Sequence, residues 1–270
     1  MNLSRSHAAE IARETDQITR DGHYTDAASR EQNIAVDTER ASDQTRSYPP
    51  DWTPEFPGQA RFETRVEVNN ETTLRAARRL MDDGFNAVAL NFASAKHVGG
   101  GWLNGARAQE EYLCRHSTLA HCLGNQPDFY EFHQTHRAPQ YSSWMLYSPA
   151  VPVIRDEDND LMAPWPQAFI TAAAPNLNNG MAMPTRELNE LWRERIARVF
   201  DVALHHDHDA LILGAWGCGA FKNDPNIVTE AFADVIQDYD GQFKMLSFAV
   251  LDVGLTQGNY EFFARHLNNI

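Results

Sequence analysis

The chain has 270 residues, 43% of them hydrophobic, which is enough for one large core, either as a single domain or as a domain with an extension. Its formal charge of −14 argues against an extended nucleic-acid-binding surface, because phosphate backbones are held mainly by clustered Lys and Arg. No apolar run approaches membrane-spanning length, and residues 1–7 have no apolar stretch behind a basic start, so we expect a cytoplasmic protein without a membrane partner.

The first sixty residues differ from the rest in composition. Residues 3–20 have the Ala, Ile and charged residues of a helix, and residues 21–60 then contain several turn formers. Their apolar density is lower than that of the remaining chain. We therefore expect residues 1–60 to form a mainly helical N-terminal extension, packed on a core domain of residues 61–270.

From residue 62 the pattern alternates between strands and helices. It predicts a strand at 62–68, a capped helix at 70–81 and a buried strand at 86–92. This order is typical of a βαβ unit. Helical spacing follows at 110–123, one or two strands at 144–154, and another apolar strand at 168–174.

The clearest helix spans residues 185–204, where apolar side chains recur at i, i+3 and i+4 intervals and Thr185 is the expected N-cap. The all-apolar strand at 210–213 is of the kind that is buried on both faces of a sheet. Asp224 at the N-cap and Pro225 at the first helical position then open the next helix. A strand at 246–251 and a short helix near 260–267 complete an α/β alternation.

A glycine-rich loop directly follows the buried strand at 86–92. Its three consecutive glycines are Gly99, Gly100 and Gly101. Glycine lets a ligand approach the backbone closely, and the carboxyl ends of strands are where open α/β sheets bind ligands. A flexible surface turn is the competing interpretation, because glycine clusters are common in loops. In both cases we expect this loop to be exposed.

Gln109, Glu110 and Glu111 come seven residues after these glycines. A Glu pair at the start of a helix is usually explained by complementation of the helix dipole. Glycoside cleavage usually employs two carboxyl groups on opposite sides of the bond, about 5–10 Å apart, whereas sequence neighbours project in divergent directions. The better hypothesis is a division in which one Glu transfers a proton and the other binds sugar hydroxyls.

A second glycine-rich segment, GAWGCGAF at 214–221, lies between the strand at 210–213 and the next helix. This is the position of a phosphate-binding turn, and its backbone amides can hold a small diphosphate even in a protein of acidic net charge. The segment is not a dinucleotide-binding fingerprint, because Lys222 stands where the third glycine should be, and it is not a Walker A loop. Core packing is the expected role of Trp216, whereas Phe221 fits the core or a ligand equally well.

Together the two segments resemble one family, the poly(ADP-ribose) glycohydrolases, and in particular their compact bacterial type. The resemblance rests on GGG-x7-QEE at 99–111 and GAWGCGAF-x-ND at 214–224, with Asn91-Phe92-Ala93 ahead of the first motif. Two spaced motifs in the correct order are far more specific than either alone. The implied fold is a macrodomain, a three-layer α/β/α arrangement around a central mixed sheet. The implied activity is hydrolysis of the ribose–ribose bond at the terminal ADP-ribose unit, with residues 61–270 as the catalytic domain.

The resemblance also implies roles for individual residues. Glu111 would be the catalytic acid, which protonates the departing ribose oxygen and then helps to activate water, and Glu110 would hold hydroxyls of the neighbouring ribose. The other implied ligand-binding positions are Asn91 at the distal ribose, Gly99, Gly100, Gly101 and Gln109 near the scissile bond, Gly217, Cys218, Gly219 and Ala220 as phosphate donors, and Phe221 stacking near the distal ribose. The implied partners are ADP-ribose, poly(ADP-ribose) and ADP-ribosylated protein, bound by a monomer without a cofactor.

Two positions depart from the family pattern, although neither removes a proposed chemical group. Val98 occupies a position where the bacterial type often has proline, and Lys222 replaces a residue that is commonly glycine. Three activities stay open: an exo-acting polymer hydrolase, a hydrolase of single ADP-ribose groups on protein or nucleic acid, and a non-catalytic reader of ADP-ribose. The retained motif at 109–111 argues against the reader.

Other patterns that could bind a metal have simpler explanations. The histidines within 205–209 end a helix, where cationic side chains offset the helix dipole, and His133 with His136 lacks a third ligand. The cysteines are too few and too irregularly spaced for a disulfide framework or a zinc site; they are Cys114, Cys122 and Cys218. We therefore expect reduced thiols, no metal and no cofactor.

Overall fold

The computed structural model describes residues 3–54, 58–136, 138, 140–178, 183–252 and 258–268. The chain divides into two compact units. Unit 1 comprises Met1–Pro49, Asn91–Arg137 and Trp144–Ala173, and unit 2 comprises Pro50–Leu90, Ala138–Ser143 and Ala174–Ile270.

Unit 1 begins with the predicted N-terminal helix, α1 (Arg5–Asp21). Ser4 caps it by accepting a hydrogen bond from the His7 amide, and Gly22 ends it in the left-handed conformation, at φ 74°. The next elements are short and were not evident in the sequence; they are β1 (His23–Thr25), β2 (Glu31–Asn33), α2 (Ala35–Asp43) and β3 (Arg46–Tyr48). β1 pairs antiparallel with β2, and β3 pairs antiparallel with β6 (Met145–Arg155). The turn-rich segment therefore contributes a strand to the main sheet.

Four helical elements follow the first glycine loop. They are the 3₁₀ turn η1 (Trp102–Asn104), α4 (Gln109–His116), α5 (Leu119–Gly124) and α6 (Pro127–Thr135). The helical spacing predicted at 110–123 corresponds to two helices, α4 and α5, because the backbone leaves the helix at Ser117. The Ser117 hydroxyl donates to the Leu113 carbonyl at 2.8 Å, and its backbone forms a β-bridge with Val153. A tertiary contact thus interrupts a continuous helical pattern.

The strands β6 and β7 (Leu161–Ala172) form an antiparallel hairpin in unit 1. β7 begins well before the predicted strand at 168–174. Its prolines concealed this first half, because proline cannot donate a ladder hydrogen bond and is uncommon within strands. Pro152 and Pro166 are register partners, so prolines oppose each other in the hairpin.

Unit 2 is built on parallel strands. β5 (Ala87–Phe92) pairs with β8 (Ala210–Leu213), β8 with β9 (Met245–Ala249), and β9 with β4 (Arg65–Asn69). The helices of this unit are α3 (Thr73–Asp82), α7 (Thr185–His205), α8 (Pro225–Asp238) and α9 (Asn259–Leu267). Every residue of β8 is buried, as its all-apolar composition predicted.

The two predicted helix starts in unit 2 have different outcomes. The Asp224 carboxylate accepts a hydrogen bond from the Asn226 amide and Pro225 occupies the first turn, which confirms the start of α8. The prediction of Thr185 as the N-cap of α7 is wrong by one position. Pro184 is the capping residue, without a side-chain hydrogen bond, and Thr185 is already helical.

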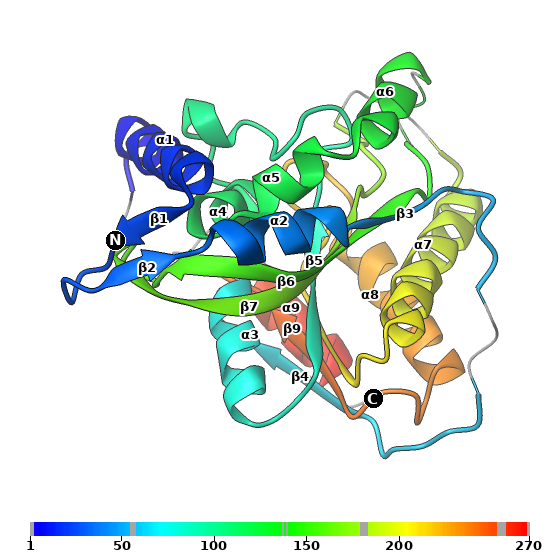
Figure 1. The fold of residues 1–270 in the computed structure, drawn as a ribbon. Coiled ribbons are helices and arrows are strands. Elements are labelled where there is room, and N and C mark those ends of the chain that lie inside the picture. Colours follow the sequence, from blue (N-terminus) through cyan, green and yellow to red (C-terminus); the bar gives the residue numbers. More distant parts are fainter. Residues whose placement is uncertain are drawn as a thin grey trace. The chain divides into compact units, whose positions relative to one another are not determined.

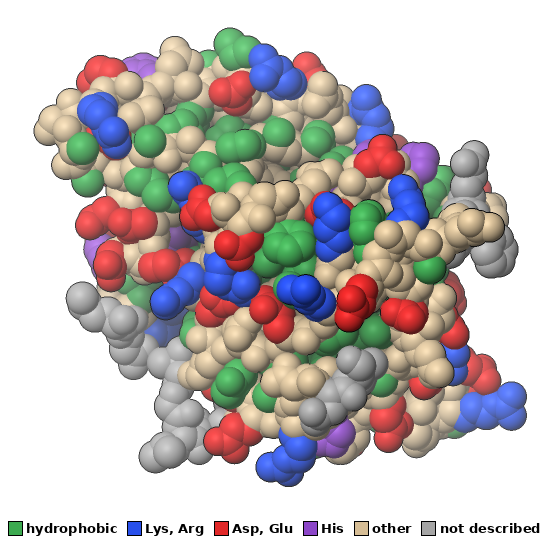
Figure 2. Space-filling view, turned by 90° about the horizontal axis from the view of Figure 1, so that it is seen from below, with side chains coloured by type: hydrophobic (Ala, Val, Ile, Leu, Met, Phe, Trp, Pro, Cys, Tyr) green, Lys and Arg blue, Asp and Glu red, His purple; other side chains and the backbone are tan. Residues whose placement is uncertain are grey.

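Seven strands, in the order β3-β6-β7-β5-β8-β9-β4, form the main sheet, which is flanked by helices (Figure 1). The predicted α/β class with a central mixed sheet is confirmed. Within the described ranges, no helix is long and apolar enough to cross a membrane. On the face shown in Figure 2, Lys and Arg side chains lie among Asp and Glu side chains, so the described residues of this face form no extended basic patch.

Candidate active site

The carboxylates Glu110 and Glu111 lie in the first turn of α4, and both are buried, with 3% and 9% of their surface exposed. The two oxygens of Glu110 are held by the segment at the end of β5. The Ser94 amide donates to Oε2 at 2.7 Å, and Nδ2 of Asn91 donates to Oε1 at 3.3 Å. Asn91 is itself fully buried. The orientation of Glu110 is therefore set by the protein.

Glu111 is held at one oxygen by the glycine loop. The Gly101 amide donates to Oε1 at 3.0 Å. The other oxygen, Oε2, is buried, and no hydrogen-bond partner for it is found among the described residues. Buried polar atoms in native proteins are nearly always paired, so this oxygen marks a place for water or a ligand.

The expectation that the glycine loop is exposed is wrong. Gly99 is buried, and Gly100 and Gly101 are partly buried, because α4 packs onto them. A Cβ added at Gly100 would overlap the carboxylate of Glu111, and Gly100 also has a left-handed backbone, at φ 60°. This glycine is therefore needed for the close approach of Glu111.

The last member of the motif, Gln109, is anchored to the same strand end. Its Oε1 accepts a hydrogen bond from the Phe92 amide at 2.9 Å. Gln109 and Glu110 thus bind backbone amides that flank the end of β5, and they hold the first turn of α4 there.

Burial raises the pKa of Glu110 to about 8. The Ser94 amide and Asn91 oppose this rise, and the negative charge of Glu111 adds to it. A raised pKa favours the protonated form of the Glu110 carboxyl, and a carboxylic acid in this form can donate a hydrogen bond or a proton.

The second glycine-rich loop, between β8 and α8, makes few hydrogen bonds of its own. The Cys218 amide donates to the Ala215 carbonyl at 3.2 Å, and the Lys222 amide donates to the Gly219 carbonyl at 3.1 Å. No hydrogen bond between described residues engages the amides of Gly217, Gly219 and Ala220. Of the four predicted phosphate donors, Cys218 is thus the one whose amide is already occupied.

Phe221, at the end of this loop, lies beside an aromatic residue that the sequence did not single out. The ring centroids of Phe221 and Tyr141 are 6.1 Å apart, and the rings are inclined by 54°. Nδ2 of Asn176 donates to the Tyr141 hydroxyl at 3.3 Å, and the Phe221 carbonyl accepts from the Leu177 amide at 2.9 Å. Phe221 is partly exposed.

Trp216 belongs to the core, as predicted. It is fully buried, and its ring packs edge-on against Trp192 with centroids 5.1 Å apart. A Cβ added at Gly217 would lie 2.8 Å from the Cβ of Ala174, so packing as well as ligand access requires this glycine. Residues 172–174, three consecutive alanines at the end of the predicted strand at 168–174, are also buried.

Sequence reasoning missed two residues around Glu110. Ser94 directly follows the Asn91-Phe92-Ala93 segment ahead of the first motif, but nothing in its residue type marked its backbone amide as a hydrogen-bond partner of Glu110. Tyr130 comes from α6, which the sequence did not predict. Its hydroxyl is buried without a hydrogen-bond partner among the described residues, and burial together with the charge of Glu110 raises its pKa well above the usual range.

The patterns that were set aside as metal or nucleophile sites have structural roles. Nδ1 of His133 and Nδ1 of His136 bond to carbonyls within their own helix. Burial raises the pKa of the Cys218 thiol to about 12, so it is a poor nucleophile at neutral pH. In the part of the chain that the structure describes, no group of three His, Cys, Asp or Glu side chains could hold a metal ion.

Comparisons with known proteins agree with this geometry. A family model described as the catalytic domain of microbial-type PARG, poly(ADP-ribose) glycohydrolase, matches residues 12–156. The glycohydrolase from Thermomonospora curvata bound to the inhibitor ADP-HPD is 41% identical over 96% of this chain and 99% of that chain, with a TM-score of 0.89. The glycohydrolase from Deinococcus radiodurans in complex with ADP-ribose is 37% identical over 85% and 96%, with a TM-score of 0.76.

No curated protein matches the chain. The matched family model nevertheless spans more than half of the residues, and the solved structures match nearly the whole length. The chain therefore belongs to the microbial-type poly(ADP-ribose) glycohydrolases.

Proposed function

We propose that the protein hydrolyses the ribose–ribose O-glycosidic bond of poly(ADP-ribose) at the terminal unit and releases ADP-ribose. The observation that carries this proposal is the buried pair of Glu110 and Glu111, held by backbone amides beside the first glycine loop. One oxygen of the pair, Oε2 of Glu111, has no partner among the described residues. The ADP-ribose and the inhibitor held by the two bacterial relatives support the ligand class.

In this proposal Glu111 is the catalytic acid. Its carboxylic acid form donates the proton from Oε2 to the leaving ribose oxygen as the bond between that oxygen and the anomeric carbon breaks. The carboxylate that remains accepts a proton from water, and this water adds to the anomeric carbon. Negative charge in the buried pair stabilises the oxocarbenium-like state between the two steps.

Glu110 is assigned to the sugar next to the scissile bond. Both of its oxygens are fixed by protein donors, and their remaining lone pairs can accept hydrogen bonds from ribose hydroxyls. Oδ1 of Asn91 is a second acceptor beside it, because it is buried without a partner in the described part of the chain. We assign Asn91 to this ribose on that ground, which replaces its sequence-based assignment to the distal ribose.

The backbone of the two glycine-rich loops is assigned to the remainder of ADP-ribose. Amides of the loop between β8 and α8 bind the diphosphate, since dipoles of this kind hold phosphate without a cation. The donors are Gly217, Gly219 and Ala220, while the occupied Cys218 amide lines the loop. Phe221 stacks near the distal ribose. Gly99, Gly100, Gly101 and Gln109 line the ribose at the scissile bond.

We also propose that the enzyme is monomeric, acts in the cytoplasm and needs no metal. Its three cysteines are free thiols, which suits a reducing compartment. Calorimetry in the presence of a chelator tests the metal independence, and we expect ADP-ribose to bind with micromolar or tighter affinity. Binding that appears only after magnesium is added would contradict this part of the proposal.

The substrate assignment is tested with three defined substrates: poly(ADP-ribose), a mono-ADP-ribosylated protein and a mono-ADP-ribosylated nucleic acid. Released ADP-ribose and residual chain length are measured over time. We expect monomeric ADP-ribose from the polymer at the earliest times, as terminal cleavage requires. Release from the mono-modified substrates alone would make the protein a mono-ADP-ribosyl hydrolase, and binding without release from any substrate would make it a reader.

A further inference from the structure

Arg115 is a buried cation on the same helix as the two carboxylates. It stands one helical turn after Glu111, and only 3% of its surface is exposed. Burial lowers the pKa of Arg115, and the negative charge of Glu111 is the largest influence that counteracts this. Removing a guanidinium from water is costly unless nearby groups compensate. The protein thus buries a positive charge next to the carboxylate pair, at a cost in solvation free energy. Neither sequence motif includes this position.

A chain of hydrogen bonds connects the guanidinium of Arg115 to the carboxylate of Glu111. Its Nη1 donates to the Ala106 carbonyl at 2.6 Å, and the Ala106 amide donates to the Gly101 carbonyl at 3.2 Å. The Gly101 amide in turn donates to Oε1 of Glu111. The loop from Gly101 to Ala106 is therefore held by two side chains of α4, with Glu111 at its beginning and Arg115 at its end.

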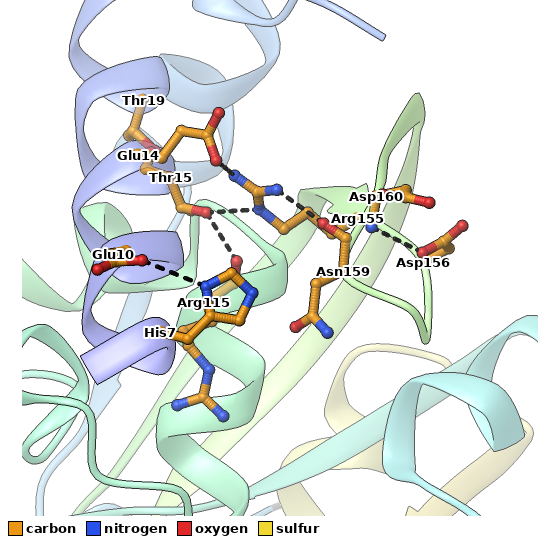
Figure 3. A network of polar contacts seen from close by, with 10 residues as sticks. All are labelled: His7, Glu10, Glu14, Thr15, Thr19, Arg115, Arg155, Asp156, Asn159 and Asp160. Carbon is orange, nitrogen blue, oxygen red and sulfur yellow. Dashed lines mark hydrogen bonds and ion pairs between the residues drawn. The ribbon is translucent and has the colours of Figure 1, made fainter. Parts of the chain in front are cut away.

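The backbone of Arg115 is fixed from the other side by α1 and β6 (Figure 3). The Thr15 hydroxyl donates to the Arg115 carbonyl at 2.8 Å, and the same hydroxyl accepts a hydrogen bond from Nε of Arg155 at 3.0 Å. Nη2 of Arg155 pairs with Glu14 at 2.7 Å. Thr15 and Arg155 are buried in this network, and Glu14 is its exposed end, so the Arg115 carbonyl is bound to α1 while the guanidinium is bound to the Ala106 carbonyl.

The same helix α1 also covers the loop that Arg115 holds. Nε of Arg5 donates to the Asn104 carbonyl at 3.0 Å, and a Cβ added at Gly105 would overlap the Arg5 carbonyl. Further along α1, Ala12 packs in one apolar cluster with Trp102. The loop is thus confined between α1 and α4.

We propose that Arg115 is a positioning residue for the hydrolysis: it anchors the loop between Gly101 and Ala106, and through the Gly101 amide it orients the Glu111 carboxylate. This inference rests on the proposed role of Glu111 as the acid. A displacement of about 1 Å at a reacting group can cost about 100-fold in rate, so a loosened loop should lower turnover without removing any group that contacts the substrate.

The test compares Arg115→Met, which removes the charge and the donor, with Arg115→Lys, which keeps both in a different shape. We expect the kcat of Arg115→Met on poly(ADP-ribose) to fall by about 10- to 100-fold. The Kd for ADP-ribose, measured by calorimetry, should stay within about threefold, because the diphosphate is assigned to the loop between β8 and α8 and not to the loop between Gly101 and Ala106. Arg115→Lys should recover part of kcat, since its ammonium can still donate to the Ala106 carbonyl.

Arg79→Met is the matched control. Arg79 lies on α3 and pairs with Glu67 and Glu71, so its loss removes two arginine ion pairs that do not involve the loop between Gly101 and Ala106. We expect a lower melting temperature and an unchanged kcat. A wild-type kcat in folded Arg115→Met, or an equal loss of kcat in Arg79→Met, overturns the positioning role.

Thr15→Val keeps the test decisive if Arg115→Met does not fold. It replaces the hydroxyl that binds the Arg115 carbonyl with a methyl group of similar size, and we expect kcat to fall severalfold with little change in Kd. Wild-type kcat in Thr15→Val would then overturn the proposal. A failure of the proposed role of Glu111 as the acid is a separate result. It would be shown by hydrolysis at the wild-type rate in Glu111→Gln.

Discussion

The two glycine-rich loops differ in what the protein itself does with them. Around Glu110 and Glu111, carboxylates occupy the amides of the first loop, and the space above Gly100 is filled by a carboxylate. In the second loop, the amides of Gly217, Gly219 and Ala220 have no acceptor among the described residues, and a Cβ added at Gly219 would have no neighbour within 4 Å. The first region is thus organised before a ligand arrives, whereas the second keeps its donors for one.

The largest effect that this comparison predicts is at Glu111. Glu111→Gln keeps the size of the side chain and can still accept from the Gly101 amide, but it cannot deliver a carboxylic proton. Turnover should fall by about 10²- to 10⁴-fold, while the affinity for ADP-ribose is largely retained. Rate and Kd are measured on the same preparation. If Glu111→Gln is active and Glu110→Gln is dead, the two carboxylates have the opposite roles.

A matched pair of glycine substitutions sharpens the contrast between the loops. Gly100→Ala places a methyl group against the Glu111 carboxylate at a left-handed backbone position, so stability should fall by about 1–3 kcal/mol and turnover by more than about 10-fold. Gly219→Ala meets no neighbour and should leave the melting temperature unchanged. Thermal unfolding and turnover are measured for both. Equal destabilisation by the two variants would show that the first loop is no more tightly packed than the second.

The protonation of Glu110 predicts a pH-dependent stability. Its pKa rises from an ordinary value of 4.5 to about 8 in the folded protein, so its contribution to stability is fully present below about pH 4.5 and is lost as the pH rises through 8. Glu110→Gln cannot ionise. The melting temperature of this variant relative to the wild type should therefore increase from pH 5 to about pH 8 and then level off. A constant difference over this range would mean that Glu110 ionises as it does in water.

The smallest predicted effect is at Lys222, in the second loop. Lys222 has a φ of 61°, which explains why a glycine suits this position and why the family commonly has one. Lys222→Gly should relieve this strain and stabilise the protein by less than about 1 kcal/mol, because glycine also gains freedom in the unfolded chain. Chemical denaturation provides the measurement. A loss of stability would show that the Lys222 side chain contributes contacts that outweigh the strain.

The elements that the sequence predicted well are those with local signals. Asp224 and Pro225 mark a helix start by their own chemistry, and the four apolar residues of β8 are buried by composition alone. The break at Ser117 was not predictable, because it depends on a bridge to Val153 in a distant strand. The short elements between residues 21 and 60 were missed for the same reason, since their strands form only by pairing.

The candidate site follows the same rule. The motif at 109–111 pointed to the two carboxylates through its resemblance to the family, and the structure shows that both are buried, while their catalytic role stays a prediction. Their support was not predictable, since the Ser94 amide has no sequence signature and Arg115 acts through a carbonyl. The sequence explained the glycines at 99–101 by the close approach of a ligand. The structure adds a second explanation, because the Glu111 carboxylate packs against this loop.

The network that joins Thr15 to the end of α4 determines the order in which contacts form during synthesis. The Thr15 hydroxyl binds partners that lie 100 and 140 residues later in the chain. At about 5–20 residues per second, a ribosome needs roughly 7–28 seconds to make the more distant of them after Thr15. The hydrogen bond between Thr15 and Arg155 can therefore form only after β6 has been synthesised. The network that fixes the end of α4 is complete only when more than half of the chain exists.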